Sequence, residues 1–201
     1  MNRITLVDYI GYCDSKGEVT GHTAKTLKET KEMLSDSYDV SMVVTPPYAQ
    51  FFDDSCIASV LPYESSPQRQ SSKFKKIGLY IKKIRAVRNI VNNESTVWFV
   101  NTDFWLYVGL LFSKKKKRQK IFATNYLDFY SKKNLKNFIY NCAVKKINCV
   151  FHTNVELKRD KHQYVPDYWF DKRKYDKYFV KEKQKDVYIC GEINEGKDII
   201  G

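Results

Sequence analysis

Polar side chains follow several apolar runs of this chain, at the positions where the strands of a sheet would end. Hydroxyl, amide and carboxylate groups predominate among them, and this chemistry suits a hydroxylated ligand such as a sugar. The residues of this set are Gly11, Tyr12, Gly21, His22, Asn101, Thr102, Asp103, Thr124, Asn125, Tyr126, Asp128, His152, Thr153 and Asn154.

Several members of this set also have a purely structural interpretation. Asp103 is a candidate base, but the helix predicted to begin at Phe104 favours a capping role for its carboxylate. Asp128 either orients an acceptor hydroxyl or caps a helix near Ser131, and the sequence leaves both roles open. A histidine at a strand end, such as His152, is more often packed or solvated than catalytic.

The segment 21–23, Gly-His-Thr, precedes a predicted helix. Free amides and the helix dipole at such a position favour an anion such as a phosphate, although an ordinary helix cap explains the segment equally well. The chain contains neither G-x-G-x-x-G nor G-x-x-x-x-G-K-[ST]. The absence of these motifs argues against a standard nicotinamide-dependent enzyme and against a P-loop NTPase.

Strand-like and helix-like segments alternate along the chain that carries these residues. The clearest helix begins near Phe74, where apolar residues at 74, 77, 81, 84, 87 and 91 form one stripe. The other predicted helices cover 21–36, 104–112 and 131–146. Strands are predicted from β-branched and aromatic residues at 3–10, 38–47, 57–63, 96–103, 119–126 and 147–154.

This alternation predicts an α/β fold with a doubly wound, parallel, Rossmann-like sheet that has helices on both faces. The segments 97–100 and 121–123 are apolar at successive residues, as expected for strands with both faces buried. In such a sheet, ligands bind beyond the carboxyl ends of the strands. The fold therefore predicts that the polar residues above line one crevice.

The five cysteines are scattered without a C-x-x-C pair, and the three histidines show no ligand spacing. We therefore expect no disulfide framework, no metal site and no cofactor, and a reducing cytoplasmic location. The formal net charge is +12, which attracts polyanions. The basic run Lys114–Lys120 predicts reversible docking on an anionic membrane face; solvated helix surfaces are the alternative.

Four segments resemble the N-terminal half of GT-B glycosyltransferases, the large retaining group that uses nucleotide sugars. They are "TGHT" at 20–23, "VWFVNTD" at 97–103, "KIFATNYLDF" at 120–129, and "INCVFHTNVELK" with "YVPDYWFD" within 147–171. A fifth segment, "VYICGEINEGKDIIG" at 187–201, resembles the first strand and loop of the family's C-terminal domain.

The resemblance implies an acceptor domain at 1–184, followed at 185–201 by a linker and the start of an incomplete donor domain. It implies hexosyl transfer from a nucleotide sugar to a surface-polysaccharide or lipid-linked acceptor, with no transfer by this polypeptide alone. Gly21, His22 and Lys197 would face the donor phosphates, and Asp128 and Asp103 would be the catalytic candidates. The acceptor-binding residues would be Tyr12, Asn101, Thr102, Tyr126, His152 and Asn154.

Two other functions are compatible with the sequence. The chain could be a non-catalytic subunit, or one half of a two-chain enzyme docked on the inner membrane face, with a separate donor-domain chain completing the cleft. A basic module for nucleic acid is disfavoured, because the chain lacks RNA- and DNA-binding motifs and its lysines are not interleaved with aromatic residues.

Overall fold

A computed structural model describes residues 2–11, 19, 22–63, 72–125, 135–152 and 161–164. The chain divides into two units, Met1–Phe170 and Asp171–Gly201, and every described residue belongs to the first. The predicted domain boundary at 184/185 lies outside the described residues.

The described residues form a seven-stranded sheet in the order β3-β2-β1-β4-β5-β6-β7, and every neighbouring pair is parallel. The predicted doubly wound, Rossmann-like α/β fold is therefore confirmed. The strands are β1 (Asn2–Val7), β2 (Tyr38–Val44), β3 (Ile57–Val60), β4 (Thr96–Phe99), β5 (Lys120–Asn125), β6 (Cys149–His152) and β7 (His162–Tyr164).

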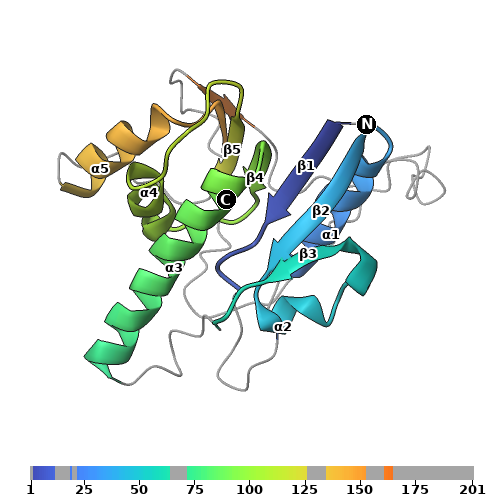
Figure 1. Ribbon diagram of the computed structural model, residues 1–201, viewed down its shortest axis with the longest axis horizontal. Coiled ribbons are helices and arrows are strands. Elements are labelled where there is room, and N and C mark those ends of the chain that lie inside the picture. Colours follow the sequence, from blue (N-terminus) through green and yellow to red (C-terminus); the bar gives the residue numbers. More distant parts are fainter. Residues whose placement is uncertain are drawn as a thin grey trace, which may run out of the picture. The chain divides into compact units, whose positions relative to one another are not determined.

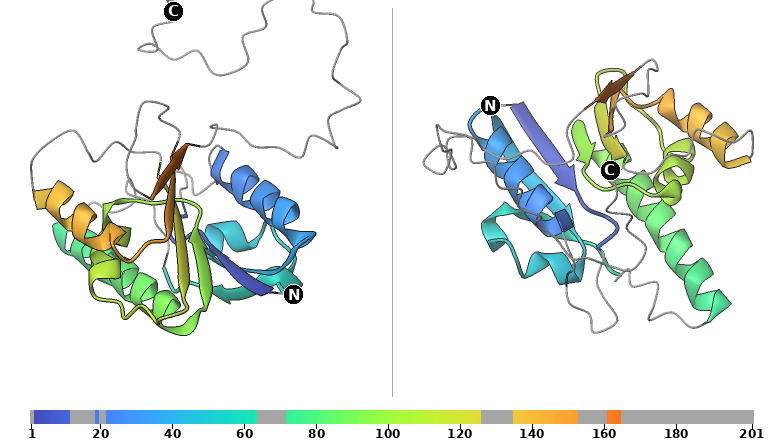
Figure 2. Two further views of the ribbon diagram at one scale, coloured as in Figure 1. Left: turned by 90° about the horizontal axis from the view of Figure 1, so that it is seen from above. Right: turned by 180° about the vertical axis from the view of Figure 1, so that it is seen from behind.

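Helices cover both faces of this sheet (Figure 1). One face packs against α1 (His22–Ser35) and α2 (Pro46–Ala49), and the other against α3 (Lys73–Asn93), α4 (Phe104–Leu111) and α5 (Leu135–Val144). A short 3-10 helix, η1 (Asp54–Cys56), precedes β3. Seen from above in Figure 2, the sheet separates α1 from the group formed by α3, α4 and α5.

The central strands are buried on both faces, as their continuous apolar runs predict. Val97, Phe99 and Val100 are fully inaccessible, and so are Ile121 and Ala123 of the neighbouring strand. Successive side chains point to opposite faces of the sheet. Each central strand therefore contributes to two hydrophobic clusters, one on each face. This is the pattern expected when parallel strands are joined by helices that cross over either face.

The strand predicted at 38–47 ends at Val44, because α2 begins at Pro46. Proline is well suited to the first helical position, since its φ angle is already helical and the amide it lacks would have no partner there. Pro47 also removes the second amide of the helix as a partner for the Thr45 side chain, which makes no capping hydrogen bond. The prolines thus start a helix here as well as ending the strand.

The apolar stripe predicted on α3 is only half buried, which corrects the sequence interpretation. Val87 and Val91 are fully buried, whereas Phe74 is 85% exposed. At 100° per residue, Phe74 and Val87 lie roughly 140° apart around the helix, too far to face the same surface. The buried face of α3 instead includes Leu79, Lys83, Ala86 and Ile90.

Charged side chains fix both ends of α4 relative to the core. Asp103 caps its N-terminus by accepting hydrogen bonds from the amides of Trp105 and Leu106. At the other end, Lys146 Nζ donates to the carbonyl oxygens of Leu110, Leu111 and Ser113 at 2.7, 2.9 and 2.8 Å. An anion at the N-terminus and a cation at the C-terminus both match the helix dipole.

Candidate functional site

The topological switch point of the sheet lies between β1 and β4. From β1 the chain continues outward through β2 and β3, and then returns to β4 on the other side of β1. Loops diverge at the carboxyl ends of such a pair and leave a crevice where ligands bind in doubly wound folds. Residues 8–11 follow β1 and residues 100–103 follow β4, so these two segments form the described walls of the candidate site.

Asp8, directly after β1, organises the first wall. Its Oδ1 atom accepts hydrogen bonds from the amides of Ile10 and Gly11 at 3.0 and 3.1 Å. Its Oδ2 atom accepts a 2.9 Å hydrogen bond from Asn101 Nδ2, which joins the two walls. Burial raises the pKa of the Asp8 carboxyl, and the hydrogen bonds from Gly11, Asn101 and Ile10 oppose this shift only in part.

Gly11 is held in a conformation that side chains rarely adopt. Its φ angle is +57°, in the left-handed region. A Cβ atom at this position would lie 1.8 Å from Thr45 Oγ1, so the backbone turns against the end of β2 at a distance that only glycine allows. The loop that leads from β1 toward α1 is therefore fixed in direction from its first residues.

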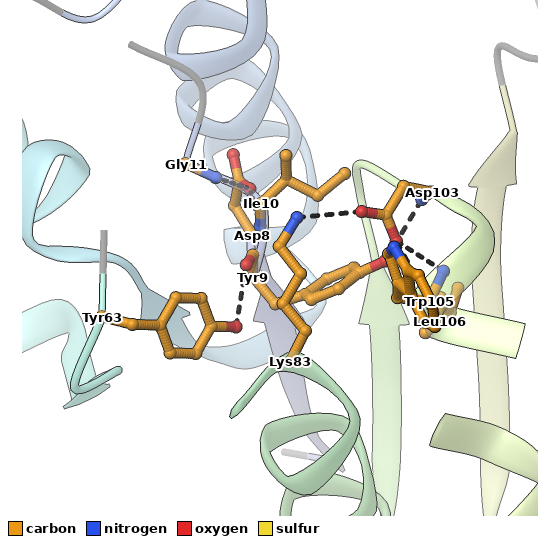
Figure 3. Close-up of polar contacts among 9 residues, drawn as sticks. All are labelled: Asp8, Tyr9, Ile10, Gly11, Tyr63, Lys83, Asp103, Trp105 and Leu106. Atoms are coloured by element: carbon orange, nitrogen blue, oxygen red, sulfur yellow. Dashed lines mark hydrogen bonds and ion pairs between the residues drawn. The ribbon is translucent and has the colours of Figure 1, made fainter. Parts of the chain in front are cut away.

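Asp103 organises the second wall and contacts four other residues. Beyond its two capping bonds, its Oδ1 atom accepts a hydrogen bond from the Tyr9 hydroxyl, and its Oδ2 atom lies 2.9 Å from Lys83 Nζ. Figure 3 shows Lys83 reaching from α3 to Asp103 beside the Tyr9 ring. Both oxygens of the carboxylate are thus engaged. The predicted cap is confirmed, and a catalytic role for Asp103 stays a prediction.

Two tyrosines complete the support beneath these walls. The Tyr63 hydroxyl donates a 2.9 Å hydrogen bond to the carbonyl oxygen of Tyr9, and Lys83 Nζ lies 5.7 Å from the Tyr9 ring centroid. Burial, followed by the nearby Asp103 charge, raises the pKa of both phenols, so both remain neutral hydrogen-bond donors. The resulting network joins β1, the end of β3, α3 and the start of α4.

The structure brings Asn101, Thr102 and Asp103 together at the switch point, as predicted. Thr102 Oγ1 donates to the carbonyl oxygen of Thr124 at 2.7 Å, and the Thr124 hydroxyl accepts from Trp98 Nε1 at 2.9 Å. These hydroxyls and the Asn101 amide are buried, so they hold the strand ends in register and do not point freely into solvent.

His152 lies at the end of β6, two strands away from β4. Its side chain is 3% exposed, and its ring centroid lies 5.9 Å from that of His162 and 6.4 Å from that of Tyr164. This is the packed environment that the sequence interpretation favoured. An acceptor-binding role for His152 stays a prediction.

The other predicted site residues are only partly covered by the structure. α1 begins at His22, as expected for a helix N-terminus beside the first strand, but the His22 side chain lies outside the description. Outside the described residues altogether are Tyr12, Gly21, Tyr126, Asp128, Asn154 and Lys197.

Sequence reasoning missed Asp8, Tyr9, Tyr63 and Lys83. The first strand was predicted to continue to residue 10, which hid Asp8 as a strand-end residue. Lys83 is not part of the predicted apolar stripe, although it shares the helical spacing of the buried Leu79, Ala86 and Ile90. A lysine on the buried side of a helix is a signal that a carboxylate partner lies nearby.

Two hollows among the described residues lie away from the switch point. One, of about 360 Å³, lies at the amino ends of the strands and includes Arg3, Thr96 and Lys120 in its lining. The other, of about 470 Å³, lies between β3 and α3 and includes Val60, Lys82 and Arg85. No set of three or more His, Cys, Asp or Glu side chains within the described part of the chain is placed to hold a metal ion.

No protein-family model matches the chain, and no curated protein sequence is significantly similar to it.

Proposed function

We propose that the described unit is the acceptor-binding part of a glycosyltransferase that uses a nucleotide sugar. The observation that supports this proposal is the switch point of an all-parallel sheet, between β1 and β4, where residues 8–11 and 100–103 follow the two strands. The four segments that resemble the GT-B group supply the substrate class. Sheets of this kind bind many unrelated ligands, so the fold alone supports a binding site and the resemblance supports sugar chemistry.

The two walls have different roles in this proposal. Asp8 and Gly11 fix the start of the β1–α1 loop, whose downstream residues would face the donor phosphates. The Asp103 carboxylate, with its partner Lys83, lies at the end of the second wall, where α4 begins, and is partly exposed. A fixed carboxylate at this position suits a hydrogen bond from a sugar hydroxyl, which is a charge-assisted interaction.

Calorimetric titration of the full chain with hexose oligosaccharides and nucleotide hexoses tests this function. We expect saturable binding of an oligosaccharide that weakens at least about tenfold in Asp103→Asn, because a charge-assisted hydrogen bond contributes roughly 1.5–3 kcal/mol. Asparagine still caps α4, but it leaves buried Lys83 without its carboxylate partner, so thermal unfolding must first show that the variant is folded at the titration temperature. Asp39→Asn is the matched control, since Asp39 is exposed near the amino end of β2. Equal weakening in both variants, or no binding by any compound, would contradict the proposal.

A further inference from the structure

The first half of α3 presents apolar side chains to solvent. Phe74, Ile77 and Ile81 are 85%, 53% and 43% exposed. They are separated by three and four residues, so they lie along one side of the helix, opposite the side that packs on the core. We call these three residues the α3 stripe. Figures 1 and 2 show the beginning of α3 extending beyond α4 and away from the sheet.

Basic residues surround the α3 stripe. On a helix of 100° per residue, Lys73 borders it on one side, Arg85 and Lys82 border it on the other, and Arg88 follows it one turn further on. All four side chains are exposed, whereas Lys83 is buried against Asp103. The helix contains no acidic residue, and its basic residues are Lys73, Lys75, Lys76, Lys82, Lys83, Arg85 and Arg88.

We propose that this face of α3 docks on the surface of an anionic phospholipid bilayer. An interfacial helix inserts apolar side chains at the boundary between headgroups and acyl chains while its lysines and arginines pair with lipid phosphates. The α3 stripe and its basic border supply both parts. Nucleic acid would use the charges but leave the stripe in water, and a second copy of the chain would bring like charges together.

The docking face is close to the switch point. Lys83 of the same helix contacts Asp103 at the carboxyl end of β4, and the α3 stripe lies on the turns just before Lys83. A bilayer bound to α3 would therefore lie near the carboxyl ends of the strands, which carry the candidate site. The proposal does not rest on sugar transfer, because it concerns only the contact between α3 and lipid.

The sequence suggested the basic run Lys114–Lys120 as the membrane contact, but this run lies on the opposite side of the domain, at the amino ends of the strands. Lys120 pairs with Thr96 at the amino ends of β5 and β4. Lys115 Nζ also hydrogen-bonds Asn148 Oδ1 at 2.8 Å, and Gln119 is buried within the core. The exposed residues Lys116, Lys117 and Arg118 provide a control with the same charge at a different edge.

Co-sedimentation of the full chain with lipid vesicles tests the proposal. The vesicles contain phosphatidylcholine alone or phosphatidylcholine with phosphatidylglycerol. One variant removes the α3 stripe (Phe74→Ser, Ile77→Ser, Ile81→Ser), and another removes charge from its basic border (Lys73→Gln, Lys82→Gln, Arg85→Gln). The control variant carries Lys116→Gln, Lys117→Gln and Arg118→Gln. All these positions are exposed, so thermal unfolding should show that each variant keeps the fold.

We expect binding to the phosphatidylglycerol vesicles that weakens at least about tenfold in both α3 variants. Each basic residue near an anionic bilayer strengthens binding by roughly fivefold before screening, whereas charges more than about 10 Å from the lipid contribute little. The control variant should therefore lose less than about threefold. The proposal is overturned by absence of vesicle binding, by equal loss in the control, or by full binding after removal of the stripe.

Discussion

Lys83 and Asp103, 20 residues apart in sequence, form an ion pair of 2.9 Å in which both side chains are largely removed from solvent. The pair connects the buried face of α3 to the N-terminus of α4 and supports the wall that follows β4. A buried pair of this kind is costly to break, because the remaining charge has no adequate partner.

Lys83→Met should destabilise the protein by roughly 3 kcal/mol, since Asp103 would keep its charge in a mostly buried position. Asp103→Ser in the same background should recover part of this loss, because serine retains the helix cap without the charge. Urea unfolding of the two single variants and the double variant forms a double-mutant cycle that measures the coupling. Strictly additive effects would mean that the pair does not stabilise this region.

Asp8→Asn should reduce the dependence of stability on pH. The pKa of Asp8 is raised above its ordinary value of 3.8, so the native state holds this proton at pH values where the unfolded state has released it. The stability due to this group is fully present below pH 3.8 and is lost as the pH rises through the raised pKa. The asparagine variant lacks this titration.

Above that window, Asp8→Asn should therefore be more stable relative to wild type than it is in acid. Chemical unfolding of both proteins across a series of pH values measures the difference. A constant difference at all pH values would show that Asp8 has an ordinary pKa in the folded protein.

Gly11→Ala should destabilise the protein by more than about 2 kcal/mol, from left-handed backbone strain together with overlap at Thr45. Gly78→Ala is the matched control, because a Cβ at Gly78 meets nothing within 4 Å and the residue lies inside α3. The control should gain roughly 0.5–1 kcal/mol in helix stability. Thermal unfolding compares the two, and a tolerated alanine at position 11 would disprove the close approach.

Cys56 should react with iodoacetamide faster than Cys149 at neutral pH. Lys31 Nζ lies 2.6 Å from Cys56 Sγ and lowers the pKa of this thiol, whereas burial raises the pKa of Cys149. Peptide mass spectrometry over a time course measures both rates. Lys31→Met should slow alkylation at Cys56 and leave Cys149 unchanged; equal rates in the wild type would refute the assigned ordering.

Periodicity in the sequence was sufficient to predict the sheet. Continuous apolar runs at 97–100 and 121–123 indicated strands buried on both faces, and the alternation with helices indicated parallel pairing. The Asp103 cap was predictable because capping depends on residues within one helical turn. These features are local, or they follow from rules that hold for every doubly wound sheet.

The supporting network of the site could not be predicted in the same way. Contacts such as Tyr63 to Tyr9 and Lys83 to Asp103 join elements whose distance in space depends on the finished packing. The α3 stripe is a second feature that the sequence alone could not place. Helical spacing identified its apolar residues, but only the position of α4 and the sheet decides which part of the helix is covered.

Backbone amide NMR of the full chain tests the central claim of ligand binding at the switch point most directly. On addition of hexose oligosaccharides or nucleotide hexoses, we expect chemical-shift changes concentrated at the amides of Ile10, Gly11 and residues 101–103. Changes confined to the amino ends of the strands, at Arg3, Thr96 and Lys120 beside the 360 Å³ hollow, would contradict the claim. So would the absence of any shift at saturating sugar.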